Sequence, residues 1–259
     1  MKNKIVFFDI DGTLLDHQKE IPVGTRSAIQ ELSERQVPMI IATGRAPFMF
    51  KALRESLGID GYVSFNGQYV SYEDSCVYEN PLDESILQKL VTHSNEFDHP
   101  MVFLNTEEGK ATHDQHPHIQ KSMNDLKMHH PAHEPDFFRG RSIFQALLYC
   151  EKATEESFYK DAYKDFNFIR WHQYSIDVLP RTGSKAVGIE KMIQHLGYHQ
   201  EDVIAFGDGL NDLEMLEYAG TGIAMGNGKE AAKRSADFVT KAVDDDGIRH
   251  GLKKLGLIR

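Results

Sequence analysis

Four short and continuous apolar runs most constrain the fold of this chain. They span residues 5–10, 37–42, 203–206 and 222–225. Each run is followed by a glycine or a polar turn and then by a helix-like segment. Strands that are apolar throughout, rather than alternating, are typical of a parallel sheet covered by helices on both faces. The sequence therefore predicts an α/β fold with a parallel sheet.

The middle of the chain has a different pattern. Two helical segments, at residues 82–95 and 154–166, alternate with strand-like pieces that come in pairs or after short turns. Paired strands are typical of an antiparallel α+β module. We therefore expect residues 1–82 and 183–259 to form one core domain, with residues 83–182 inserted as a second, α+β domain.

Charge and hydropathy restrict the classes of partner. The formal charge of -10 disfavours binding to nucleic acid or to an anionic membrane. No apolar run approaches the roughly 18 residues of a membrane span, and the N-terminal run is too short for a signal peptide. Cys76 and Cys150 cannot build a disulfide framework and match no metal spacing. We expect a cytoplasmic protein that acts on small molecules, as a monomer or small homo-oligomer.

The first predicted strand ends in two acids. Asp9 follows four apolar residues and precedes Ile10, and Asp11 comes next in the segment DIDGT. A turn would explain the glycine, but a carboxylate at the edge of apolar surroundings is costly without a cation or hydrogen-bond donors. Asp208 and Asp212 follow the third run, in FGDGLND. Because ligands of a parallel sheet bind beyond the carboxyl ends of its strands, these acids predict one shared site.

Hydroxyl, amide and cationic groups follow the other strand ends. Thr43 offers a hydroxyl and Gly44 an accessible backbone amide in the segment ATGR. Lys185 stands near the start of a predicted helix, and Asn211 lies in FGDGLND. Carboxylates suit a hard divalent cation such as Mg²⁺, whereas Thr, Lys, Asn and glycine amides suit phosphate oxygens. The combination predicts phosphoryl transfer, although Lys185 taken alone is typical of a solvated helix surface.

Together these segments resemble the phosphatases of the haloacid dehalogenase superfamily, in the Cof-like branch with a class IIB cap. The resemblance spans nearly the whole chain and rests on DIDGT, TGR, FNGQYV, KAVGIEKM, FGDGLND and AMGNGKEAAKRSADFVT. It implies a Rossmann-like core and a mobile cap that meets the leaving group. It also implies Mg²⁺ as cofactor and small phosphorylated metabolites, such as sugar phosphates or phosphorylated cofactors, as substrates.

The resemblance implies a role for each acid. Asp9 would attack phosphorus to form an aspartyl-phosphate. Asp11 would protonate the leaving alkoxide and then activate water, which requires a pKa raised near the ionised Asp9. The backbone carbonyl of Asp11 and the side chains of Asp9 and Asp208 would hold Mg²⁺. Asp212 would orient Lys185 or a metal-bound water, although an acid at a helix start is also typical of a cap or dipole partner.

The resemblance also implies a cradle for the transferring phosphoryl group. Hydrogen-bond donors placed there would stabilise the charge that develops during transfer. The groups expected to form it are Thr43, the Gly44 amide, Lys185, Asn211 and the Ile10 amide.

Two other functions would use the same residues. A phosphotransferase or mutase forms the same aspartyl-phosphate. Asp11 could activate either acceptor of the phosphoryl group, water or a second hydroxyl, so the sequence does not separate these functions. A noncatalytic regulatory protein could retain the fold, but such a protein is expected to lose a nucleophile, an acid or a metal ligand, and this chain keeps Asp9, Asp11, Lys185 and Asp208.

Histidines and aromatic residues of the insert remain open to interpretation. Six histidines, whose spacing allows a zinc site, stand among prolines and charges that favour a solvated loop or a cap helix: His113, His116, His118, His129, His130 and His133. Four aromatic residues favour core packing, with a lid over the site as the alternative: Phe137, Phe138, Trp171 and Tyr174.

Overall fold

Two compact units make up the chain. The structure, a computed structural model, describes residues 4–259 apart from the side chains of residues 153 and 154. One unit contains residues 1–45, 49–79 and 183–259, and the other contains residues 46–48 and 80–182. The second unit therefore includes residues 80–82, which the sequence assigned to the core domain.

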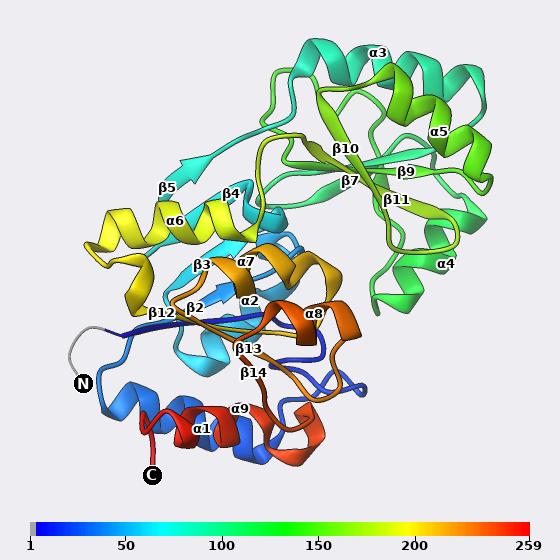
Figure 1. Cartoon of the computed structure of the whole chain (residues 1–259). Helices are drawn as coiled ribbons and strands as arrows, with labels where there is room; N and C mark the ends of the chain where they lie inside the picture. The colour runs from blue at the N-terminus through cyan, green and yellow to red at the C-terminus, as the bar shows by residue number, and fades with distance from the viewer. Residues whose placement is uncertain (1–3) are drawn as a thin grey trace. The chain divides into compact units, whose positions relative to one another are not determined.

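An eight-stranded sheet forms the framework of the first unit (Figure 1). In spatial order its strands are β14 (Phe238–Val239), β13 (Thr221–Ala224), β12 (Val203–Gly207), β1 (Ile5–Phe8), β2 (Met39–Ala42), β3 (Gly61–Ser64), β4 (Tyr69–Tyr72) and β5 (Ser75–Glu79). The strands from β14 to β3 run parallel, whereas β4 and β5 add an antiparallel edge. The predicted α/β fold with a parallel sheet is confirmed, and each of the four apolar runs overlaps a strand.

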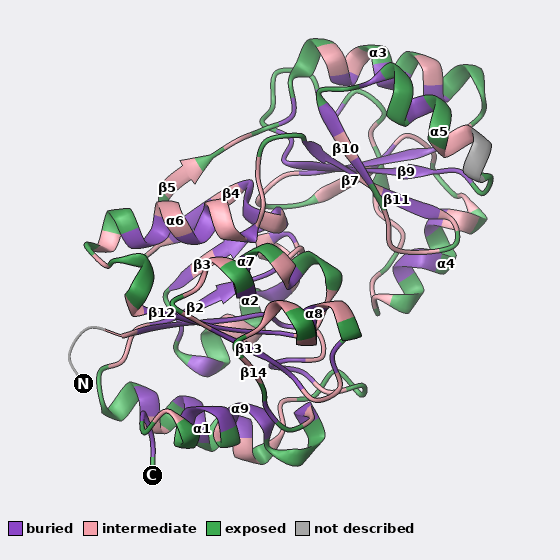
Figure 2. Cartoon of the chain, viewed as in Figure 1, coloured by how far each residue is buried: buried purple, intermediate pink, exposed green. Residues whose placement is uncertain are grey.

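Helices cover both faces of this sheet, so its central strands are buried throughout (Figure 2). Val6 and Phe8 of β1 pack on one side, and Ile5 and Phe7 pack on the other. The first side is covered by α1 (Val23–Glu34), α2 (Pro47–Leu57) and α9 (Gly247–Lys254). The second side is covered by α6 (Lys185–Leu196), α7 (Leu213–Tyr218) and α8 (Glu230–Ser235). Short 3-10 turns lie at η1 (Phe65–Gly67), η2 (Gln200–Asp202), η3 (Leu210–Asp212) and η4 (Val243–Asp245).

The position of β1 in the sheet determines where a ligand can bind. β1 lies between β12 and β2, which come from opposite halves of the chain. Connections therefore leave on both sides of β1, and a crevice at the carboxyl ends of the strands is expected at this point. Asp9, Thr43 and Asp208 each directly follow one of these three strands.

A six-stranded sheet forms the framework of the second unit. In spatial order its strands are β10 (Phe166–Arg170), β11 (Ser175–Pro180), β9 (Gln145–Tyr149), β6 (Met101–Leu104), β7 (Gly109–Ala111) and β8 (Ala132–His133). All pairings are antiparallel except that of β7 with β8. This arrangement is the expected α+β module.

Helices α3 (Glu84–Glu96) and α5 (Ala153–Ala162) pack on one face of this sheet, and α4 (Pro117–Asp125) bonds to the other face through Ser122. Phe137 and Phe138 are buried in the hydrophobic core beside α3, which confirms their interpretation as core residues. The helix predicted at residues 154–166 ends at Ala162, because the chain turns there and Phe166 begins β10.

The two ends of the second unit meet. Asn80, where the chain enters this unit from β5, donates a hydrogen bond from Nδ2 to the backbone oxygen of Thr182, where the chain leaves it (2.5 Å). Strand order and this bond together show that the insertion begins and ends at neighbouring points.

No helix described between residues 4 and 259 is both long and apolar enough to cross a membrane.

Close packing of α6 on the first sheet depends on a glycine. A Cβ at Gly188 would collide with Val63 Cγ1 and would lie 3.1 Å from the Cα of Gly67. Gly188 is one turn after Lys185, so this contact helps to fix the start of α6 relative to the ends of the strands.

We expect Gly188→Ala to lower the free energy of unfolding by about 1–3 kcal/mol, because overpacking at this contact outweighs the better helix propensity of alanine. Urea unfolding measures the change. Gln194→Ala, at an exposed position of the same helix, is the control and should shift stability by less than about 0.5 kcal/mol. A Gly188→Ala protein as stable as the wild type would show that α6 can move away from β3 without cost.

Candidate active site

A buried ammonium group lies at the centre of the first unit's strand ends. Lys185 is 1% exposed, and its Nζ is 2.6 Å from Asp9 Oδ1 and 2.6 Å from Asp212 Oδ1. Burial opposes the charge of Lys185, but the carboxylates of Asp212 and Asp9 outweigh this effect and raise its pKa, so the ammonium stays protonated. The alternative of a solvated helix residue is therefore wrong for Lys185.

Asp212 connects this ammonium to the loop after β12. While Oδ1 accepts from Lys185, Oδ2 accepts from the backbone N–H groups of Asp208 (2.8 Å) and Gly209 (2.7 Å). The side chain is completely buried. Asp212 thus accepts hydrogen bonds from the backbone at the start of the turn, as a cap would, and also binds Lys185. The sequence offered capping and orientation of Lys185 as alternatives, and the structure shows contacts of both kinds.

The turn after β1 comes close to Asp208. Gly12 has a φ of +80°, and a Cβ there would collide with the Asp208 carboxylate. Thr13 Oγ1 donates to Asp208 Oδ1 at 3.4 Å. Asn227 Nδ2 donates to the Gly12 oxygen (2.8 Å), and its Oδ1 accepts from the backbone N–H of Val243 (2.8 Å). The sequence alone assigns no role to Asn227, although this residue lies in the segment AMGNGKEAAKRSADFVT.

Three carboxylates at this point could hold a metal ion. Among residues 4–259 as described, Asp9, Asp208 and Asp212 are the group of possible ligands whose atoms all lie within 4.8 Å of one another. Burial raises the pKa of Asp208 to about 6, and the charge of Asp212 adds to this rise. Burial also raises the pKa of Asp9, against the pull of Lys185. Three acids share one ammonium, so the cluster is short of positive charge, as expected of a cation site.

Asp9 and Asp208 are the better candidates for direct coordination. Both oxygens of Asp212 already accept hydrogen bonds from Lys185 and two backbone N–H groups. The six histidines of the insert form no comparable group within the described part of the chain. The zinc site that their spacing allowed therefore has no preformed ligand set.

Asp11 differs from our expectation. Its carboxylate accepts from Arg45 Nε (2.8 Å) and Nη2 (2.6 Å), and from Lys19 Nζ (2.5 Å). Burial raises the pKa of Asp11, but hydrogen bonds and charge from Arg45 and Lys19 outweigh burial and hold the pKa below its ordinary value. The expected rise near Asp9 is thus wrong for this structure, because two cations bind the carboxylate. Arg45 is the arginine of the TGR segment and received no role from the sequence.

Thr43, Gly44 and Asn211 come together around Asn66. Thr43 is buried, and its Oγ1 accepts from the backbone N–H of Arg45 (3.2 Å). Asn211 Nδ2 donates to Asn66 Oδ1 (3.0 Å). A Cβ at Gly44 would lie 3.0 Å from Asn66 Nδ2. Asn66, in FNGQYV after β3, joins the turns after β2 and β12. The sequence leaves a contact between Asn66 and substrate open, because Gln68 follows in place of a small residue.

Comparison with known proteins agrees with this geometry. A family model of haloacid dehalogenase-like hydrolases matches residues 6–252. The chain belongs to this family. The Bacillus subtilis protein YkrA is 46% identical over 259 residues, which cover 100% of both chains.

Solved structures extend the similarity to the fold. A Geobacillus kaustophilus protein shares 53% sequence identity with a TM-score of 0.95, over 99% of this chain and 100% of that one. The HAD subclass IIB sugar phosphatase BT4131 shares 28% identity with a TM-score of 0.86, over 98% of this chain and 100% of that one. The resemblance to the Cof-like, class IIB branch is confirmed, and the chain is a HAD-like phosphatase.

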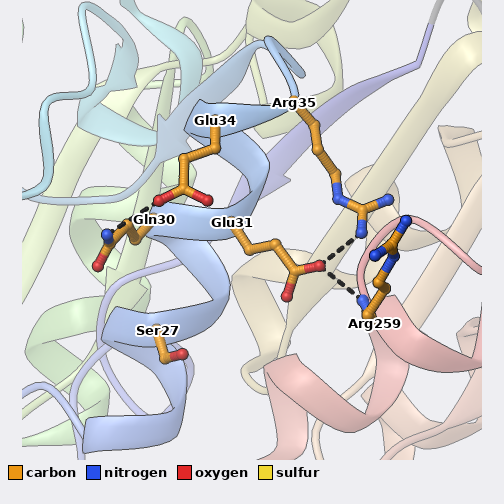
Figure 3. Close-up of a pocket in the computed structure, with 6 residues that line it drawn as sticks. All are labelled: Ser27, Gln30, Glu31, Glu34, Arg35 and Arg259. Atoms are coloured by element: carbon orange, nitrogen blue, oxygen red, sulfur yellow. Dashed lines mark hydrogen bonds and ion pairs between the residues drawn. The ribbon is translucent and has the colours of Figure 1, made fainter.

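A surface pocket of this phosphatase lies apart from the carboxylate cluster. It has a volume of about 360 Å³ and lies between α1 and the C-terminal residue (Figure 3). Glu31 Oε1 already accepts from Arg35 Nη2 (2.6 Å) and from the backbone N–H of Arg259 (2.7 Å). The pocket contains none of the residues around Lys185, so we do not assign the chemistry to it.

We expect Lys185→Met to destabilise the protein most at alkaline pH. Burial already raises the pKa of Asp9, and removing Lys185 takes away the main charge that opposes this rise. The pKa of Asp9 then lies further above that of the unfolded chain, so stability falls as pH rises. Breaking a buried ion pair in this way costs about 3–5 kcal/mol. Thermal unfolding in the presence of a chelator should show a larger loss at pH 8 than at pH 5.

Lys191→Met, at a partly exposed position of the same helix, is the control and should show little dependence on pH. A Lys185→Met loss that is equal at both pH values would contradict the electrostatic role of this residue.

Proposed function

We propose that this phosphatase is a Mg²⁺-dependent phosphomonoester hydrolase that acts through an aspartyl-phosphate on Asp9. The observation that carries the proposal is the buried Lys185 ammonium, held at 2.6 Å from both Asp9 and Asp212 with Asp208 nearby. A buried carboxylate next to a fixed cation at the end of a central strand fits a nucleophile whose surroundings stabilise a phosphoryl group.

In the first step, an oxygen of Asp9 attacks phosphorus, and the bond between phosphorus and the leaving oxygen breaks. Lys185 neutralises charge on the transferring group in this proposal. Thr43, the Gly44 amide, the Ile10 amide and Asn211 complete the set of hydrogen-bond donors. Asp11 gives its proton to the leaving alkoxide. Asn66 acts indirectly, since its contacts hold Gly44 and Asn211 in place.

In the second step, Asp11 accepts a proton from water as the water oxygen attacks phosphorus. The bond between phosphorus and Asp9 breaks, which releases inorganic phosphate and restores both acids. Before it can act, Asp11 must leave its ion pairs with Arg45 and Lys19 and take up a proton. We propose that these contacts open when substrate binds, because they favour the ionised acid.

The carboxylate cluster fits a divalent cation by its donor set and by its shortage of positive charge. The side chains of Asp9 and Asp208 and the backbone carbonyl of Asp11 would hold it. Mg²⁺ bound there would neutralise the carboxylates and the phosphate oxygens during transfer. Asp212 would stay outside this set, bound to Lys185 and the backbone.

The substrates proposed are small phosphorylated metabolites, with the insert at residues 83–182 as a mobile cap that contacts the leaving group. A sugar phosphatase among the structural relatives supports this class. The net charge of -10 also disfavours a polyanionic substrate.

Asp9→Asn should lower kcat by more than about 10³-fold, because the amide cannot attack phosphorus. Calorimetric titration should show that substrate still binds, since size and shape are kept. Phosphate release by the wild type should stop when Mg²⁺ is removed with a chelator and return when it is added. Asp244→Asn, at an exposed site, should leave turnover unchanged. Residual turnover near the wild-type rate in Asp9→Asn would refute the nucleophile assignment.

Asp11→Asn should slow substrates with poor leaving groups most. An alkyl phosphate needs the proton that Asp11 donates, whereas an activated aryl phosphate leaves without it, so we expect a loss of about 10²–10⁴-fold for the alkyl ester and a smaller loss for the aryl ester. Single-turnover kinetics on both esters make the comparison. Equal losses on both would show that Asp11 is not the acid.

A further inference from the structure

One side chain connects the loop after β13 to the turn after β1. Asn227 Nδ2 donates to the Gly12 oxygen (2.8 Å), and Asn227 Oδ1 accepts from the backbone N–H of Val243 (2.8 Å). In the sheet, β12 lies between β13 and β1. The Asn227 side chain therefore joins the ends of two strands that are not neighbours.

The same loop contacts Asp208, which follows the intervening strand β12. Lys229 donates its backbone N–H to the Asp208 oxygen (2.8 Å). Gly228 is buried, and a Cβ there would lie 3.1 Å from both the Cα and the oxygen of Asp208. Residues 227–229 thus contact the turn after β1 and the turn after β12 at the same time. Both turns carry groups that we propose to hold the cation.

The backbone of this loop is itself held in place. Gly226 donates its N–H to the Lys241 oxygen (2.9 Å), and a Cβ at Gly226 would lie 2.7 Å from the Ala242 nitrogen. Val243, which donates to Asn227, is completely buried. A supporting side chain can keep a site in register only if its own backbone and rotamer are fixed. The contacts of Gly226 and Val243 meet this condition.

Common local reasons for an asparagine in a loop do not apply here. Asn227 does not have a left-handed backbone. It does not cap the next helix either, because α8 has Lys229 at its N-cap position. The position instead requires one donor that faces a carbonyl and one acceptor that faces an N–H. An amide supplies both, whereas a carboxylate supplies acceptors only.

We infer that Asn227 is a positioning residue for the proposed reaction, because its bond to the Gly12 carbonyl fixes the turn that carries Asp11 relative to Asp208. This inference rests on the proposed function, in which the Asp11 carbonyl and the Asp208 carboxylate share a cation. The Gly12 carbonyl is one residue after that of Asp11, so a shift of one displaces the other. Residues that orient metal ligands commonly change metal affinity or activity by about 10–100-fold when they are replaced.

Two substitutions separate the contact with Gly12 from the contact with Val243. Asn227→Ala removes both hydrogen bonds. Asn227→Asp keeps an acceptor for the Val243 N–H but presents a carboxylate oxygen to the Gly12 carbonyl, so only the bond to the turn is lost. Gln194→Glu, at an exposed position of α6, adds the same charge elsewhere and is the matched control.

Calorimetric titration of the free protein with Mg²⁺ is the first measurement. We expect both Asn227 variants to bind Mg²⁺ about 10-fold more weakly than the wild type, and Gln194→Glu to bind it equally well. The charge added by Asn227→Asp would by itself strengthen binding of a cation, so weaker binding must come from the displaced turn. Unchanged or tighter binding in either Asn227 variant would overturn the inference.

Steady-state kinetics at saturating Mg²⁺ test the same role in the reaction. We expect kcat to fall about 10–100-fold in both Asn227 variants, because a small displacement of reacting groups is costly. KM should stay within about threefold of the wild-type value, since Thr43, Lys185 and Asn211 are unchanged. A rise in KM with kcat unchanged would show an effect on substrate binding and would contradict the positioning role.

Hydrogen exchange of residues 9–15 reports on the turn without any activity. The backbone N–H groups of Thr13, Leu14 and Leu15 are bonded within it, so both Asn227 variants should exchange faster there than the wild type. Strand β10 of the second unit is the internal control and should exchange at the wild-type rate. A thermal midpoint confirms that each variant is folded.

These outcomes separate the two proposals. Exchange and kinetics that stay at wild-type values in an active protein would reject the role of Asn227 and leave the hydrolase intact. Faster exchange of residues 9–15 in a protein that releases phosphate from no ester would support the bond from Asn227 as the support of the turn and reject the hydrolase.

Discussion

The ion pairs of the buried Lys185 ammonium are the interaction on which the site depends. Three carboxylates cannot remain close together in a buried place unless positive charge stands among them. Lys185 supplies one charge, and it can do so because α6 begins at the strand ends and packs tightly through Gly188. Asp212, which binds this ammonium, also holds the loop after β12, because it accepts hydrogen bonds from the backbone N–H groups of Asp208 and Gly209. The position of one cation is thereby tied to that of a helix, a loop and the Asp9 carboxylate.

The sheet topology explains why residues so far apart in sequence reach this ammonium. β1 occupies the place where connections diverge, and its neighbours β12 and β2 end at the same edge. Asp9, Asp208 and Thr43 follow these strands directly. Left-handed backbone at Gly12 lets the turn after β1 approach Asp208, and Asn227, in the loop after β13, donates a hydrogen bond to that turn. The site is thus a product of strand order together with a few turns of unusual backbone geometry.

Much of the fold was predictable because the central strands are apolar and are followed by a glycine or a polar turn. The antiparallel edge of β4 and β5 was not, since its side chains are partly exposed and its strands lack a continuous apolar run. Of the site, the carboxylates, Thr43 and Lys185 were visible in short motifs. Arg45, Lys19 and Asn227 were missed because their roles depend on contacts between distant turns. The pKa of Asp11 was mispredicted for the same reason. The ion pair with Arg45 depends on the direction in which each side chain points, and the positions of the residues in the sequence do not determine that direction.

The hydrogen bond from Asn80 to Thr182 has a consequence for how this enzyme could change over evolution. Because the inserted unit starts and finishes at adjacent points, a change in its length or in the order of its strands and helices need not distort the parallel sheet. A different module with similarly spaced ends could replace it without altering strand order or the Lys185 ion pairs. Such a junction allows the parallel-sheet unit and the inserted unit to be inherited separately, and a laboratory chimera made at residues 80 and 182 would use the same property.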